Sequence, residues 1–136
     1  MRVLVIDDEV RKAEPLVRYL RHVCEWYVEI ASGPDEAMRL LKTATLPYNV
    51  IILDIMMDPG TVIPRERSDG GRDTGLLLLE MIIARADRKE IVILYTARTD
   101  LGYLRGQGKV AEYVQKPGSA KEIARIITDL VGITQS

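Results

Sequence analysis

The sequence has little of several residues on which whole classes of function depend. Cys24 is the only cysteine and His22 the only histidine among 136 residues, so an internal disulfide and a multi-histidine zinc site are both excluded. The 19 basic and 20 acidic side chains leave a net charge of −1, which gives no overall attraction to nucleic acid or to an anionic membrane. A chain of this length is enough for one domain.

Long hydrophobic runs are also missing. No stretch approaches the roughly 20 apolar residues of a membrane-spanning helix, and the amino terminus passes directly into a predicted strand, without the pattern of a signal peptide. Because a lone cysteine suits a reducing compartment, we expect a cytoplasmic protein. Residues 1–136 are expected to form one domain without an output domain, since no DNA-binding helix-turn-helix fits after the last predicted helix.

Short apolar runs alternate with amphipathic stretches five times along the chain. The predicted strands cover residues 2–7, 26–31, 49–54, 90–95 and 111–115. The predicted helices cover residues 12–24, 34–44, 74–87, 98–106 and 119–131. This alternation predicts an α/β fold with a parallel sheet and helices on both of its faces.

Two helices carry residues that helices tolerate poorly. The fourth predicted helix is expected to be short or frayed, because Gly102, Gly106 and Gly108 each lower helix propensity. Pro15 is expected in the first turn of the first helix, since a proline further inside would break it.

The polarity of the strands predicts their order. The first, third and fourth strands are almost purely aliphatic, as central strands buried on both faces are. The second and fifth contain Glu29 and Glu112, which is typical of edge strands. The five-stranded sheet is therefore predicted to have the order 2-1-3-4-5 of a flavodoxin-like (βα)5 fold, in which ligands bind at the carboxyl ends of the strands.

Polar residues follow the predicted strands at those ends. Asp7 and Asp8 follow the first strand, Asp54 the third, Thr96 the fourth and Lys116 the fifth. Three carboxylates in one crevice favour a hard cation such as Mg²⁺. Asp54 is then a candidate nucleophile that forms an acyl phosphate, while the ammonium of Lys116 neutralises phosphoryl oxygens and the hydroxyl of Thr96 donates to one of them. Each acidic residue alone is more often a helix cap or a turn residue, and the prediction depends on the whole set.

The chain resembles a response-regulator receiver domain of two-component signalling over nearly its whole length. The stretches that carry the resemblance are Val5-Ile6-Asp7-Asp8-Glu9, Ile52-Leu53-Asp54-Ile55-Met56-Met57, Thr96-Ala97 and Tyr113-Val114-Gln115-Lys116-Pro117.

The resemblance implies a role for each residue of the set. Asp54 is the phosphoacceptor, and the donor is a phosphohistidine on a histidine kinase or a phosphotransfer protein of a phosphorelay. Asp8 binds Mg²⁺ directly, Asp7 does so largely through water, and the backbone carbonyl of Met56 is a further ligand. Thr96 and Lys116 respond to the phosphoryl group. The resemblance also implies a downstream protein target.

The resemblance implies two further features at the fifth strand. Tyr113 is expected to turn inward as a switch when Thr96 moves, although an aromatic side chain on an edge strand can also simply pack. The Lys116–Pro117 peptide bond is expected to be cis.

The chain departs from the family at residues 55–73, where the loop after the phosphoacceptor is much longer than usual. A functional loop beside the active site and a disordered surface insertion are both open. Leu77 and Met81 add a second apolar stripe to the third helix, and our hypothesis is that Val62 and Ile63 of the long loop fold back onto it. Arg98, just after Thr96, is either a residue that steers or shields phosphate or a solvated residue at a helix start.

Two other functions remain open from the sequence. A Mg²⁺-dependent aspartyl-phosphate hydrolase would share the nucleophile, but the family with that chemistry has an aspartate where this chain has Met56. A phosphorylation-independent binding module on the same fold is the second alternative. No Gly-x-Gly-x-x-Gly or Walker lysine motif follows the first strand, which disfavours nucleotide binding. The chain is therefore not expected to be an enzyme beyond its own phosphorylation and dephosphorylation.

Overall fold

The computed structural model describes residues 1–135, which contain a five-stranded parallel sheet with the order β2-β1-β3-β4-β5. The strands are β1 (Arg2–Ile6), β2 (Tyr27–Ala31), β3 (Val50–Leu53), β4 (Ile91–Thr96) and β5 (Glu112–Gln115). The predicted order is confirmed, and the two strands that contain glutamate are the edge strands.

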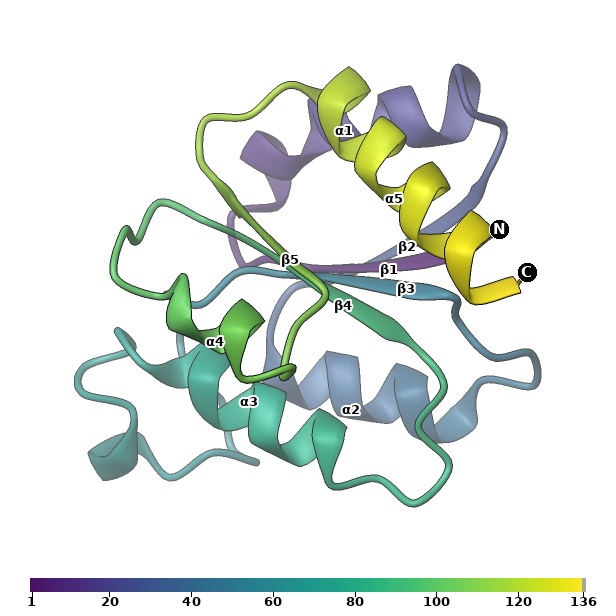
Figure 1. The fold of residues 1–136 in the computed structure, drawn as a ribbon. Coiled ribbons are helices and arrows are strands. Elements are labelled where there is room, and N and C mark those ends of the chain that lie inside the picture. The colour runs from purple at the N-terminus through teal and green to yellow at the C-terminus, as the bar shows by residue number, and fades with distance from the viewer. Residues whose placement is uncertain (136) are drawn as a thin grey trace.

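The sheet lies between two layers of helices (Figure 1). The helices are α1 (Val10–His22), α2 (Pro34–Thr43), α3 (Thr74–Ile83), α4 (Tyr103–Gly106) and α5 (Ala120–Gln135), with a short 3-10 turn η1 (Arg65–Arg67). Helices α1 and α5 cover one face, and α2, α3 and α4 cover the other. In the described part of the chain, no helix is long and apolar enough to cross a membrane.

Successive residues of the central strands point to opposite faces. Val3 and Val5 of β1 belong to the apolar cluster under α1 and α5, whereas Leu4 and Ile6 belong to the cluster that packs against α2 and α3. All four side chains are almost fully buried. Burial on both faces explains why these strands are aliphatic throughout, and it fixes the positions of the residues that follow them.

Two expectations about helices are corrected. Helix α1 begins at Val10, so Pro15 lies inside the helix and not in its first turn. Helix α4 is a single turn from Tyr103 to Gly106, so the expectation of a short helix is confirmed and the predicted bounds of 98–106 are wrong. Gly102 and Gly106 at its two ends explain the shortening.

Residues 55–73, here called the insertion, are ordered against the body of the protein. The insertion lies beside the carboxyl ends of β1 and β3 (teal in Figure 1). Ile63 is 2% exposed and belongs to the same apolar cluster as Leu77 and Met81. Val62 is 40% exposed. The hypothesis that the loop folds back is therefore confirmed for Ile63 and wrong for Val62.

Candidate functional site

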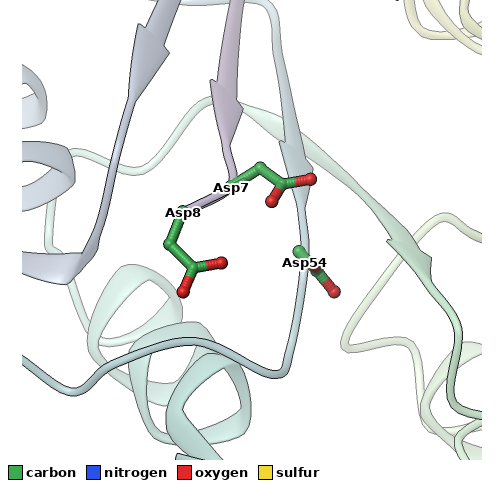
Figure 2. Close-up of side chains that lie close together, drawn as sticks. All are labelled: Asp7, Asp8 and Asp54. Atoms are coloured by element: carbon green, nitrogen blue, oxygen red, sulfur yellow. The ribbon is translucent and has the colours of Figure 1, made fainter. Parts of the chain in front are cut away.

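Asp7, Asp8 and Asp54 meet at the carboxyl ends of β1 and β3. The two strands are neighbours, and Ile6 is level with Leu53, so Asp7 and Asp54 follow side by side. Each of the three carboxylates offers an oxygen that lies within 4.8 Å of the others. Figure 2 shows the three side chains around one shared space. Asp7 and Asp54 are buried, whereas Asp8 is largely exposed.

Backbone amides orient the two buried carboxylates. The amide of Glu9 donates to Oδ1 of Asp7 at 2.9 Å, and the amide of Ile55 donates to Oδ1 of Asp54 at 2.7 Å. The Oδ2 atoms of both residues point to Lys116, whose Nζ lies 2.7 Å from Asp7 and 3.0 Å from Asp54. Asp54, the candidate nucleophile, is thus held by a backbone amide at Oδ1 and by the ammonium of Lys116 at Oδ2.

Lys116 is positioned by the end of β5. Its amide donates to the carbonyl of Thr96 at 2.9 Å, which ties it to β4, and the following peptide bond to Pro117 is cis, as expected. Burial disfavours the charged ammonium, but hydrogen bonds and charges from Asp7 and Asp54 outweigh that effect, so the pKa of Lys116 is raised. The lysine therefore carries its charge throughout the neutral range.

Asp8 is the carboxylate without a lysine. Partial burial raises its pKa, and the charges of Asp7 and Asp54 add to this effect, which a backbone hydrogen bond from Asp58 only partly offsets. Repulsion of this kind is relieved by a bound cation. The three carboxylates offer only oxygen ligands, which suit a hard ion such as Mg²⁺. They offer none of the sulfur ligands that a soft metal prefers.

Met56 lies where the carboxylates open to solvent. Together with Asp7, Asp54 and Lys116 it lines a cavity of about 400 Å³ between the sheet and α1. With Asp8 it also lines a hollow of about 390 Å³ against the insertion. Asp54 is therefore reachable from outside, and a phosphoryl group has room beside it.

Thr96 and Tyr113 both form hydrogen bonds with the backbone of Arg98, just after β4. Thr96 ends β4 and is fully buried, and its Oγ1 accepts a long hydrogen bond of 3.4 Å from the amide of Arg98. Tyr113 is half-buried on β5, packs against the core, and donates its hydroxyl to the carbonyl of Arg98.

Arg98 is not the solvated helix-start residue of the second sequence interpretation, and the first, that it steers or shields phosphate, stays a prediction. Its guanidinium does not lie open to solvent at a helix start, because its side chain is only 9% exposed and bonds to Arg72 and Asp73 at the end of the insertion. Asp35 at the start of α2 was not singled out from the sequence, yet it accepts bonds from Thr61 and Val62. Both contacts join positions far apart along the chain, so no local pattern indicated them.

Comparison with known proteins supports the fold assignment. No protein-family model matches the sequence, and no curated protein matches it either. Among solved structures, the receiver domain of the Francisella response regulator 1452 matches with a TM-score of 0.73 at 24% identity, over 98% of both chains. A receiver domain from Methanospirillum hungatei matches with a TM-score of 0.76 at 18% identity, over 98% of this chain and 95% of that one.

A third matching structure was solved with a bound ligand. The response regulator TrrA from Thermotoga maritima, solved in complex with Mg²⁺ and BeF, has a TM-score of 0.72 at 26% identity, over 95% of this chain and 97% of the other. With the 2-1-3-4-5 sheet and the acidic cluster at its carboxyl edge, these matches show that the chain has the fold of response-regulator receiver domains.

Proposed function

We propose that this chain is a phosphoacceptor receiver domain of a two-component or phosphorelay system. The observation that carries the proposal is the position of Asp54, which is buried beside Asp7 and Asp8 and is bonded by Lys116 at 3.0 Å. In that position Asp54 is paired with the ammonium of Lys116. The carboxylates of Asp7 and Asp8 lie beside it and can hold a metal cation. This arrangement suits phosphoryl transfer, in which the protein contributes mainly position and charge.

In the proposed reaction a carboxylate oxygen of Asp54 attacks the phosphorus of a phosphohistidine. A P–O bond forms, the P–N bond breaks, and its electron pair leaves with the imidazole. Lys116 balances the charge of the phosphoryl oxygens. Asp7, Asp8, Asp54 and the carbonyl of Met56 would hold Mg²⁺, which would supply further positive charge to the same oxygens.

Thr96 and Tyr113 are proposed to convert the new charge into a change of shape. The hydroxyl of Thr96 donates to a phosphoryl oxygen once one is present, and Tyr113 follows the backbone that this movement releases. The domain of residues 1–136 is proposed to act in the cytoplasm by contact with proteins: a histidine kinase or phosphotransfer protein upstream, and a downstream target. It is proposed to catalyse nothing beyond its own phosphorylation and dephosphorylation.

The test is phosphorylation with acetyl phosphate and Mg²⁺, followed by intact mass. We expect a single phosphate adduct that is lost in Asp54→Asn and on chelation of Mg²⁺, whereas Asp87→Asn, a change of the same kind at an exposed aspartate, keeps it. Sustained hydrolysis of phosphate monoesters that depends on Asp54 would favour the hydrolase instead. No adduct with any donor, together with no Mg²⁺ binding, would favour the binding module.

A further inference from the structure

The backbone of Arg98 is the meeting point of the two proposed switch residues. Its amide donates to Oγ1 of Thr96 at 3.4 Å, and its carbonyl accepts from the hydroxyl of Tyr113. The first of these bonds is near the upper limit of length for a hydrogen bond, so little stabilisation is lost when it breaks. Thr96 and Tyr113 therefore share a hydrogen-bond partner in the backbone of Arg98.

The side chain of Arg98 carries the contact onward to the insertion. Nη1 donates to the carbonyl of Arg72 at 3.1 Å and to Oδ1 of Asp73 at 2.9 Å. Nε and Nη2 donate to the two oxygens of Asp100 at 2.9 and 2.6 Å. A planar guanidinium held on both edges is a rigid connection.

Asp100 strengthens the same connection. The Arg98 guanidinium lowers the pKa of Asp100 to about 2, so Asp100 is ionised at every physiological pH. Its Oδ2 also lies 3.7 Å from Nη2 of Arg72. The segment after β4 and the end of the insertion are thus joined through two arginines that alternate with two aspartates.

Contacts within the insertion connect its two ends, and a further contact ties it to α2. Inside it, the amide of Met57 donates to the carbonyl of Gly71 at 3.1 Å, and a Cβ on Gly71 would lie only 2.9 Å from the carbonyl oxygen of Met57. At its outer end, Asp35 accepts from the amides of Thr61 and Val62. The Arg72 end of the insertion is therefore connected by the Gly71–Met57 bond to the residue next to Met56.

We propose that Arg98 couples phosphorylation of Asp54 to the conformation of the insertion, so that residues 55–73 report the phosphoryl state to a partner. The inference rests on the proposed function. When the hydroxyl of Thr96 turns to the phosphoryl group, the amide of Arg98 loses its acceptor, and the Arg98 side chain transmits the shift to Arg72 and Asp73. Arg98 is a positioning residue in this account and touches no reacting atom.

The coupling also has a reverse direction. If phosphorylation changes the affinity of the insertion for a partner protein by some factor, binding of that partner changes the stability of the phosphorylated state by the same factor. The hollow beside the carboxylates is lined by Asp8 together with Asp58, Arg65 and Arg72 of the insertion. Access to the cluster from that side therefore depends on the insertion.

The test is amide hydrogen exchange of the whole chain, measured by mass spectrometry with and without beryllium fluoride and Mg²⁺, which mimic the phosphoryl group. In the wild type we expect exchange in peptides from 55–73 to change by roughly threefold or more on addition of the mimic. Arg98→Gln and Asp73→Asn should each remove most of this response while the thermal shift caused by the mimic remains. Arg105→Gln on α4, which pairs with Glu112 and not with the insertion, should keep the response.

The outcomes separate the two proposals. A thermal shift with the mimic but unchanged exchange across 55–73 in the wild type would overturn the coupling and leave the proposed function standing. A full response in both Arg98→Gln and Asp73→Asn would overturn the role of Arg98. No thermal shift and no phosphate adduct in the wild type would contradict the proposed function, and this inference would fall with it.

Discussion

The three carboxylates of the site differ in how their charge is balanced. Asp7 and Asp54 share the ammonium of Lys116, with Nζ at 2.7 and 3.0 Å. Asp8 is more exposed and has no such partner, and its pKa is raised by partial burial and by the two neighbouring charges. A group whose pKa is raised by folding binds its proton more tightly in the folded state. Ionised Asp8 therefore lowers stability at every pH above its ordinary value of 3.8.

Asp8→Asn should consequently have opposite effects with and without the metal. In EDTA at pH 7 we expect the melting temperature to rise slightly, because the substitution removes a repelled charge whose effect solvent partly screens at the exposed Asp8. The rise should disappear as the pH falls below the ordinary value of 3.8, where the proton is bound in the folded and the unfolded state alike. The increase that Mg²⁺ gives the wild type should be largely lost in the variant.

Asp69→Asn is the matched control for that experiment, since Asp69 lies on the surface of the insertion. It should leave both the melting temperature in EDTA and the response to Mg²⁺ unchanged. A lower melting temperature of Asp8→Asn in EDTA would show that Asp8 stabilises the fold and is not strained by its neighbours.

At the scale of elements, the site depends on how closely α3 approaches β3. A Cβ on Gly75 would lie 2.4 Å from the carbonyl oxygen of Asp54 and from Cα of Ile55, and the amide of Gly75 donates to the carbonyl of Ile55 at 2.7 Å. Glycine at the start of α3 thus allows the helix to support the backbone of Asp54 directly.

Gly75→Ala should push α3 away from Asp54. We expect the free energy of unfolding to fall by about 1–3 kcal/mol, as in other overpacked sites, and phosphate uptake to slow. Gly102→Ala is the control, because no atom lies within 4 Å of a Cβ there and its φ is −58°. It should be neutral or stabilising by up to about 1 kcal/mol. Urea unfolding of both variants measures the difference, and equal effects would contradict the close-approach argument.

The insertion is an element of the core as well as of the surface. Ile63 is almost fully buried, whereas its neighbour Val62 is 40% exposed. Ile63→Ala should therefore lower the free energy of unfolding by about 2–5 kcal/mol, and Val62→Ala should change it by less than about 0.5 kcal/mol. Similar small effects at both positions would mean that the insertion does not pack on α3 in solution.

At the scale of the whole molecule, the sequence predicts the strand order and the residues that this order brings together. Aliphatic and glutamate-containing strands have different burial requirements, so polarity was enough to place β2 and β5 at the edges. Once the strands are parallel and ordered, Asp7, Asp8, Asp54 and Lys116 have to meet at one edge, as they do. The roles of these residues remain predictions of the resemblance.

What the sequence did not predict depends on contacts between distant segments. The bond from Thr61 to Asp35 and the bond from Arg98 to Arg72 each join residues 26 positions apart, and no periodicity encodes such a pairing. The prediction that Pro15 lies in the first turn of α1 was wrong for a related reason. Packing of α1 under α5 and β2 holds the helix through a residue that local propensity places at its start.

The most direct test of the account is to locate the phosphoryl group on the chain. An acyl phosphate formed with acetyl phosphate and Mg²⁺ can be reduced by borohydride, which converts the modified aspartate to homoserine, and peptide mass spectrometry then identifies the residue. The account predicts homoserine at position 54 and at no other aspartate. Homoserine at position 7 or 8, or none in a chain that carries the adduct, would contradict it.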